Sequence, residues 1–286
     1  MNKYKYTVVI PTFNEENRIE FVLKNFNKRA NILILDDGST DKTKEICDKY
    51  SVKYLIRPKP ENPTYFTKEI SGWILDNVET EYIFVCYCSI FVPLDLLNLF
   101  EKIASEGKIK AIYHDQLAIT YGRFIQRPFI RRISSSCHFF SKEALNFANK
   151  QIHGEWPIDI SEDKVLRLKA IDDLSIYIFR DYDVKFMELK HSQYADIEAL
   201  ERFENGERTN MFKLIWKPIH RFLIGYIRCG GIMAGIPGLI YHIGWASMVF
   251  NVQAKIWEYQ NNMTRLESRN VHSQMRNDLI SKIGDI

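Results

Sequence analysis

Two stretches near the N-terminus decide the fold: TVVIPTFNEENRIEFVLKNF (Thr7–Phe26) and NILILDDGSTDKTKEI (Asn31–Ile46). Each begins with a short β-branched and aliphatic run, which is typical of a buried strand. The first then continues with apolar residues at helical spacing, namely Ile19, Val22, Leu23 and Phe26. A strand, a helix and a second strand in this order predict a βαβ unit, and therefore a mostly parallel sheet.

The same alternation continues through about the first hundred residues. We expect a third strand in VKYLIRP (Val52–Pro58), a helix in PTYFTKEISGWILDNV (Pro63–Val78) and a fourth strand in EYIFVCYCSIFVP (Glu81–Pro93). One of the polar residues 39–41 is expected to cap the second helix. Because ligands bind at the carboxyl ends of the strands in such sheets, the residues directly after each strand are candidates for a site.

The second half of the chain is mixed and then changes in character. IKAIYHDQLAITYGRF (Ile109–Phe124) predicts one or two strands, and SKEALNFANK (Ser141–Lys150) a short helix. From Met211 the chain is apolar with basic flanks, and no Asp, Glu, Lys or Arg lies between Arg228 and Lys255. Three interpretations stay open: an interfacial hairpin of amphipathic helices, a buried core or dimer surface, and a membrane-spanning helix. The polar tail after residue 261 is expected to be a solvated helix or disordered.

Composition limits the class of protein. The 286 residues are 46% hydrophobic and 26% charged with a net charge of +3, which fits a folded protein and gives no support for a nucleic-acid partner. The five cysteines are scattered and odd in number, so we expect no disulfide framework and a reducing compartment. The N-terminus lacks the apolar segment of a signal peptide. We therefore expect a cytoplasmic protein, or one peripheral to the inner face of the cell membrane.

The two opening stretches resemble the nucleotide-binding start of family 2 glycosyltransferases with a GT-A fold, in which the first strand ends in Pro-x-x-Asn-Glu and the second in Asp-Asp-Gly-Ser-x-Asp. The resemblance extends over about residues 5–258 and is greatest to the branch of lipopolysaccharide-core β-glucosyltransferases. It implies an α/β GT-A fold, a Rossmann-like sheet flanked by helices. Its nucleotide-sugar half would occupy residues 1–110, its acceptor half 111–205, and a helical amphipathic extension 206–286.

The resemblance also implies the donor site. A carboxylate at the end of the second strand would accept a hydrogen bond from uracil N3–H, and the sequence leaves open whether Asp36 or Asp37 does so. Gly38 allows a tight turn there. Alternatively, the acidic stretch only caps a helix. The expected nucleotide-sugar contacts are Pro11, Thr12, Asn14, Glu15, Asp36, Asp37, Gly38, Lys68 and Cys88.

The chain departs from the family at the end of the fourth strand. Members usually carry Asp-x-Asp there, which binds Mg²⁺ or Mn²⁺, whereas this chain has Cys86-Tyr87-Cys88 and no carboxylate between Glu81 and Asp95. Hard cations prefer oxygen ligands, so the usual ligands are missing and we assign no metal site. The enzyme would then use protein cations for the diphosphate, hold its metal with carboxylates elsewhere, or have lost catalysis. The candidate cations are Lys68, Arg123, Arg131 and Arg132.

An inverting transferase needs a carboxylate that takes the proton of the acceptor hydroxyl. The stretch KQIHGEWPIDISEDK (Lys150–Lys164) resembles an Ile-His-Glu element of the branch with one residue inserted. It gives Glu155 as the first candidate for the base and Asp159 as the second. Further along, His191 is a candidate contact for phosphate or acceptor.

The expected function is transfer of a sugar, with inversion, from a nucleotide sugar such as a UDP-hexose to a cell-envelope glycan or lipid-linked acceptor. The expected partners are that donor, that acceptor, a membrane surface and a second copy bound through the C-terminal helices. One alternative is a catalytically degenerate scaffold that binds nucleotide sugar or proteins without turnover. A nucleotidyltransferase is disfavoured because PTFNEENR (Pro11–Arg18) is acidic and lacks a glycine-rich basic phosphate loop.

Overall fold

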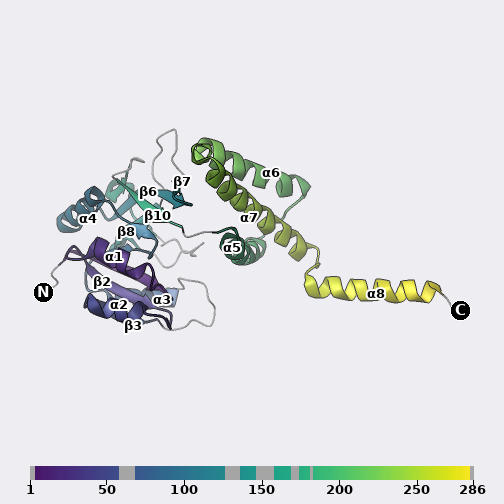
Figure 1. Ribbon diagram of the computed structural model, residues 1–286, viewed down its shortest axis with the longest axis horizontal. Coiled ribbons are helices and arrows are strands. Elements are labelled where there is room, and N and C mark those ends of the chain that lie inside the picture. The colour runs from purple at the N-terminus through teal and green to yellow at the C-terminus, as the bar shows by residue number, and fades with distance from the viewer. Residues whose placement is uncertain are drawn as a thin grey trace. The chain divides into compact units, whose positions relative to one another are not determined.

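The computed structural model describes residues 4–57, 68–125, 136–145, 158–168, 174–180 and 183–283. The chain divides into two compact units, residues 1–180 and 181–286. Figure 1 shows that strands and helices alternate in the first unit, whereas the second is helical.

The first unit follows the predicted order of strands and helices. The apolar residues predicted to face the core from the first helix are all fully buried. The elements are β1 (Tyr6–Thr12), α1 (Ile19–Phe26), β2 (Asn31–Asp36), α2 (Thr43–Lys49), β3 (Lys53–Ile56), α3 (Lys68–Asn77), β4 (Tyr82–Val85), β5 (Ile90–Phe91), α4 (Leu94–Glu106), β6 (Ala111–Thr120), β7 (Arg123–Phe124), β8 (Ser136–Ser141), β9 (Val165–Arg167) and β10 (Ser175–Phe179), with 3₁₀ turns at Lys142–Ala144 and Glu162–Lys164.

Within the described part of the chain, ten strands form one mixed sheet in the order β3-β2-β1-β4-β8-β6-β10-β5, with β7 and β9 paired to β6. The strands β3, β2, β1 and β4 are parallel, and β8 joins β4 and β6 as an antiparallel strand. This order places the carboxyl ends of the first four strands at one edge. The prediction of an α/β fold with a helical C-terminal region is confirmed.

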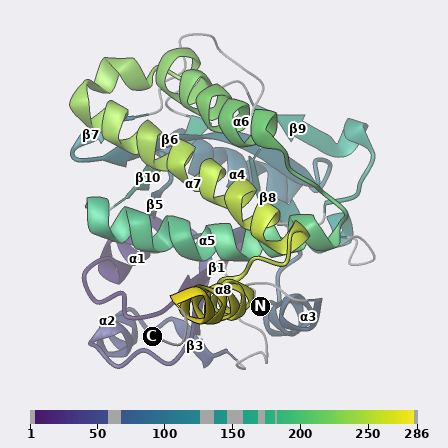
Figure 2. The same ribbon diagram turned by 90° about the vertical axis from the view of Figure 1, so that its right-hand side faces the viewer.

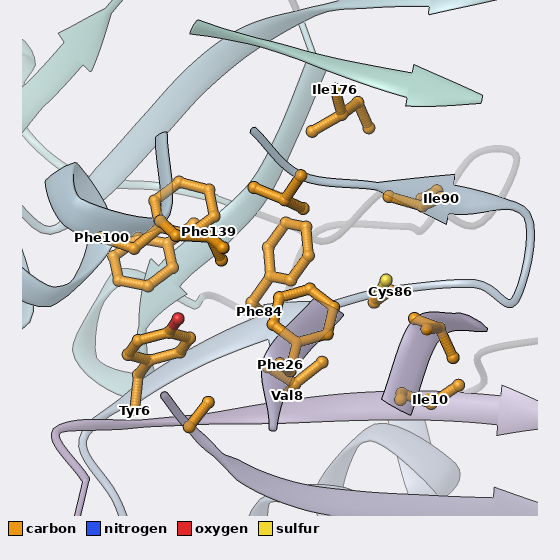
Figure 3. Close-up of a cluster of buried hydrophobic side chains, with 14 of the residues drawn as sticks. Tyr6, Val8, Ile10, Phe26, Phe84, Cys86, Ile90, Phe100, Phe139 and Ile176 are labelled. Atoms are coloured by element: carbon orange, nitrogen blue, oxygen red, sulfur yellow. The ribbon is translucent and has the colours of Figure 1, made fainter. Parts of the chain in front are cut away.

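Alternate residues of β1 supply two cores. Val8 and Ile10 face a cluster that includes α1 and α4, whereas Val9 faces a smaller cluster with α3, as the two-residue period of a strand requires. Aromatic rings fill the larger cluster, and the rings of Phe100 and Phe139 stack with their centroids 4.3 Å apart. Figure 3 shows the sulfur of Cys86 among these apolar side chains.

Two histidines meet inside the sheet. His114 of β6 is fully buried, and its Nε2 lies 3.1 Å from Nδ1 of the partly buried His138 on β8. Burial lowers the pKa of His114 to about 4. Burial, and then the neighbouring His114, also lower the pKa of His138. Both rings are therefore neutral in the folded protein at neutral pH.

This pair predicts acid sensitivity. In the unfolded state a histidine has a pKa of about 6.5, so between about pH 6.5 and 4 the unfolded chain binds protons that the folded protein does not bind. The free energy of unfolding therefore falls as pH drops from about 6.5 toward 4. The loss attributable to His114 is at most ~1.4 kcal/mol per pH unit in that window. Urea unfolding of His114→Gln should show a shallower pH dependence than the wild type. The exposed His272→Gln should match the wild type; equal slopes in all three proteins would contradict the prediction.

The second unit consists of helices. It contains α5 (Val184–Glu204), α6 (Met211–Leu223), a π-helical turn (Ile224–Arg228), a 3₁₀ turn (Gly231–Ala234), α7 (Ile236–Gln260) and α8 (Arg265–Ile283). Figure 2 shows α5 and α6 beside α7. Small side chains of α5, Ala195 and Ala199, pack against Met248 and Val252 of α7.

The packing of α5 on α7 places the start of the helical unit at residue 181, earlier than the residue 206 at which the sequence was divided. The polar tail forms the mostly exposed α8. Among the described residues, no helix is both long enough and apolar enough to cross a membrane.

Candidate functional site

The polar residues that follow the parallel strands lie next to one another. Thr12 at the end of β1 pairs with Asp36 at the end of β2, and Asp36 pairs with Ile56 of β3. Beyond the ladder, the amide of Asp37 donates to the carbonyl of Thr12 at 2.9 Å, and the amide of Arg57 to that of Asp36 at 2.8 Å. The register therefore brings the motif residues of β1 and β2 to one edge of the sheet.

The carboxylate of Asp36 is committed to the turn that follows it. Asp36 is only 2% exposed, and one of its oxygens accepts from the amides of Gly38 at 2.9 Å and Ser39 at 2.7 Å. The other oxygen accepts from the hydroxyl of Ser39. Gly38 has a φ of +92°, in the left-handed region where glycine is favoured. Asp36 thus shapes the loop rather than facing solvent.

Asp37 points its carboxylate to a different partner. Its Oδ1 and Oδ2 accept from Nε and Nη2 of Arg57 at 2.5 Å and 2.7 Å, a bidentate pair that fixes the carboxylate plane. The Asp37 side chain is 28% exposed, and that of Arg57 is 9% exposed. Because a carboxylate has about four lone-pair sites, Asp37 can still accept a further hydrogen bond. Of the two aspartates, Asp37 is the one that a ligand can reach.

Sequence reasoning missed Arg57. It follows β3 directly, so the rule that sites form after parallel strands did contain a signal for it. An arginine at this place matches no motif, however, and only the register of β2 with β3 brings it to Asp37.

Hydrogen bonds join the loop after β1 to the loop after β2. The amide of Asn14 donates to Ser39 Oγ at 2.8 Å, and Asn14 Oδ1 accepts from the amide of Thr40 at 2.8 Å. The amide of Glu15 donates to Thr43 Oγ1 at 2.7 Å. Asn14 has a φ of +53°, which asparagine tolerates better than most residues. The Asn-Glu and Gly-Ser parts of the two motifs therefore hold each other in place.

The predicted helix cap is only partly right. The carboxylate of Asp41 accepts from the amide of Thr43 at 3.0 Å and from that of Glu16 at 3.0 Å. It therefore serves the start of α2 and the opposite loop together. The acidic stretch does more than cap a helix.

Glu15 follows β1, and Cys86 and Cys88 follow the neighbouring strand β4. Glu15 accepts from Arg18 through both carboxylate oxygens at 2.7 Å. Cys88 is 4% exposed and belongs to the same buried cluster as Ile19, the first residue of α1. Burial, and then the carboxylate of Glu15, raise the pKa of the Cys88 thiol, while Arg18 opposes them. Burial likewise raises the pKa of Cys86.

These cysteines do not fit the metal of the resembled family. Mg²⁺ and Mn²⁺ prefer oxygen ligands, whereas the two thiols are buried and protonated at neutral pH. Both follow β4, which ends at Val85, and both side chains belong to the same buried apolar cluster. Among the described residues, no group of three or more His, Cys, Asp or Glu side chains could hold a metal ion.

The other predicted site residues lie elsewhere. Asp159 is exposed, and its amide donates to the carbonyl of Ala144 at 2.9 Å. Arg123 is exposed at the start of β7. Lys68 begins α3, but its side chain is not described. Glu155, Arg131 and Arg132 lie outside the described residues.

His191 belongs to the helical unit. It is 4% exposed, its Nδ1 lies 3.0 Å from the carbonyl oxygen of Gly244, and its ring centroid lies 4.8 Å from that of Trp245. These contacts pack α5 against α7, so the structure gives His191 a packing role. Its predicted contact with phosphate or acceptor stays a prediction.

Comparison with known proteins identifies the segment that carries this site. Residues 7–65 match the sequence model of the family described as Glycosyl transferase family 2. The chain is 32% identical over 84 residues to the lipopolysaccharide core biosynthesis glycosyltransferase LpsC of Rhizobium meliloti, covering 29% of this chain and 31% of that protein. It is 36% identical over 78 residues to the uncharacterized glycosyltransferase MG025 of Mycoplasma genitalium, covering 25% of this chain and 24% of that protein.

A solved structure, S. aureus TarS 1-349 in complex with UDP-GlcNAc, aligns over 93% of each chain with 16% identity and a TM-score of 0.45. The curated relatives are matched over only about a quarter to a third of their own length. The matched segment contains β1 to β3, both motif loops, and Asp37 with Arg57. The similarity to glycosyl transferase family 2 is therefore carried by this segment, residues 7–65.

Proposed function

We propose that this protein is a glycosyltransferase that binds a nucleoside-diphosphate sugar, with UDP-hexose as the first choice, at the carboxyl ends of β1, β2 and β4. The observation that carries the proposal is the accessible carboxylate of Asp37, which Arg57 holds in the segment that matches family 2, while the Asp37 amide donates to the carbonyl of Thr12. In this proposal Asp37 accepts a hydrogen bond from uracil N3–H. Asp36 and Gly38 keep the loop in shape around the nucleotide.

The proposed reaction inverts the anomeric centre. The acceptor hydroxyl oxygen attacks the anomeric carbon, a carboxylate takes the hydroxyl proton, and the nucleoside diphosphate leaves with the electron pair of the broken bond. Glu155 remains the first candidate for the base and Asp159 the second. A cell-envelope glycan or lipid-linked acceptor is supported by the name of the relative LpsC. The expected place of action is the cytoplasm or the inner face of the cell membrane.

We further propose that donor binding needs no divalent cation. The buried, protonated thiols of Cys86 and Cys88 support this, since they replace the oxygen ligands that the family usually supplies. The diphosphate charge would then be met by cations of the protein. Lys68, Arg123, Arg131 and Arg132 are the cations proposed from the sequence. Arg18, whose charge acts on Cys88 and whose side chain is 38% exposed, joins them from the structure.

Calorimetric titration tests both proposals. UDP and UDP-glucose are titrated into the full chain in EDTA, and then with Mn²⁺. Micromolar binding in EDTA is the expected result. Binding only with Mn²⁺ would overturn metal independence, and the absence of binding by UDP and UDP-glucose in either buffer would overturn the proposed UDP-sugar donor.

A turnover assay distinguishes an active enzyme from a scaffold that binds the donor without catalysis. The absence of the usual carboxylate metal ligands is the observation that favours the scaffold. Full-length protein is incubated with radiolabelled UDP-glucose and a bacterial lipid extract. Release of UDP with transfer of label to lipid supports the enzyme. Donor binding without either product would favour the scaffold.

A further inference from the structure

Helix α6 exposes an unusually apolar face. None of its residues is buried, and it begins with Met211 and Phe212, which are 80% and 70% exposed. The residues that follow at three- and four-residue spacing are exposed as well, so they share one side of the helix. We define the apolar face of α6 as Phe212, Ile215, Trp216, Ile219 and Leu223.

Basic side chains lie along another side of the helix. Lys213, Lys217 and Arg221 are spaced by four residues, which places them along one strip. Lys213 lies at the edge of the apolar face, whereas Arg221 faces α7, with its guanidinium 5.2 Å from the ring centroid of Trp245. Lys217 pairs with Glu207 at 2.6 Å, whereas Lys213 Nζ donates to the carbonyl of Arg208 at 2.6 Å and keeps its net charge.

The charge of the surrounding chain has one sign. Between Glu207 and Glu258 there is no Asp or Glu. The same stretch contains Arg208, Lys213, Lys217, Arg221, Arg228 and Lys255. An exposed apolar face in a stretch whose charged residues are all basic complements a partner surface with negatively charged groups outside and an apolar layer beneath them.

The turn between α6 and α7 extends the exposed apolar surface. Ile232, Met233 and Ile236 are 50%, 65% and 72% exposed, and Gly230 and Gly235 allow the chain to turn sharply around them with positive φ. The large apolar side chains of this turn and of the apolar face of α6 are thus exposed to water. Monomeric soluble proteins rarely expose apolar patches of this extent without an interaction partner.

A bilayer surface fits these features better than a second copy of the chain. A two-fold interface between copies would place the same surface on both sides of one contact and bring the two Lys213 charges to the same interface. An anionic lipid surface instead attracts the lysines and arginines and receives the apolar side chains below its headgroups. At thirteen residues, α6 is about 20 Å long and too short to cross the roughly 30 Å hydrocarbon layer. It would lie in the interface.

We propose that the apolar face of α6, with Lys213 at its edge, binds the surface of an anionic phospholipid bilayer. The side chains of Phe212, Ile215, Trp216, Ile219 and Leu223 enter the boundary between headgroups and acyl chains. Lys213 contacts lipid phosphates. This site lies within the helical unit, and the proposal does not depend on the proposed nucleotide site on the sheet.

Vesicle flotation with the full chain tests the proposal. Vesicles of phosphatidylcholine with about one-quarter phosphatidylglycerol should carry the protein upward at 0.1 M salt, and binding should weaken at 0.5 M salt because surface charge is screened. The double variant Phe212→Gln/Ile219→Gln should lose at least tenfold in affinity. Lys213→Glu should lose about threefold to tenfold by the charge term. The matched control, Leu279→Gln on the exposed face of α8, should bind like the wild type.

Far-UV circular dichroism establishes that each variant keeps its helices. Equal binding to neutral and anionic vesicles would overturn the anionic specificity. Equal loss in the control and the double variant would overturn the assignment to α6. Absence of vesicle binding, together with a dimer in light scattering that Phe212→Gln/Ile219→Gln dissolves, would overturn the proposal and assign the face to a second copy.

Discussion

The Asp37→Asn variant is expected to bind UDP ten- to a hundredfold more weakly than the wild-type protein. Asparagine keeps the shape of the side chain and one acceptor for Arg57, but it removes the charge and the second carboxylate oxygen. A hydrogen bond to a charged acceptor contributes about 1.5–3 kcal/mol, which corresponds to this range. Because Arg57 is only 9% exposed and loses its charged partner, a loss of ~1 kcal/mol in stability is also expected. Calorimetry and urea unfolding measure the two effects.

The neighbouring Asp36→Asn variant is the matched comparison. Its buried carboxylate accepts three hydrogen bonds from the turn, and an asparagine would point an NH₂ group at donors. We therefore expect ~2–3 kcal/mol of destabilisation, and weaker UDP binding only as far as the loop is lost. If Asp36→Asn abolished UDP binding at unchanged stability while Asp37→Asn bound normally, the assignment of the base contact to Asp37 would be wrong. If both variants bound UDP like the wild type, the nucleotide site itself would be misplaced.

Local patterns predicted the sheet, and they indicated the edge at which we propose the site. The spacing of Ile19, Val22, Leu23 and Phe26 is a property of one helix, and each parallel strand is a short apolar run, so neighbouring residues are enough to find them. The two motifs then fall after β1 and β2, at the edge where ligands bind. This part of the fold depends little on contacts between distant residues.

The roles of individual site residues depended on such contacts. Asp36 and Asp37 are adjacent and identical, and only the turn at Gly38 and the arrival of Arg57 from β3 give them different partners. In contrast, the packing role of His191 did have a local signal. Met187, His191, Ala195 and Ala199 recur every fourth residue and are all buried. A histidine in a row of small apolar residues is typical of a helix interface.

The second large effect on stability is expected from a substitution at Gly238 in α7, where α7 packs against the turns that connect it to α6. We call α6, these turns and α7 the helical hairpin. His242 is 1% exposed and lies against Gly225 and Gly231, where a methyl group on either glycine would overlap its imidazole ring. A Cβ on Gly238 would overlap the carbonyl oxygen of Gly231, which is backbone and cannot rotate away. The π turn, the 3₁₀ turn and α7 therefore approach each other more closely than side chains would permit.

We expect Gly238→Ala to destabilise the helical unit by ~3 kcal/mol, because overpacking against backbone exceeds the ~1 kcal/mol that alanine gains over glycine in a helix. The matched variant is Gly244→Ala in the same helix. There the new methyl group would meet the end of the Met187 side chain, with Cε at 2.5 Å and Sδ at 2.8 Å, and this flexible chain can move aside. Its stability should stay within about 1 kcal/mol of the wild type. Hydrogen exchange of α6 and α7, read by mass spectrometry, measures both variants in the full chain. Equal protection in the two variants would mean that the backbone contact at Gly231 does not limit the hairpin.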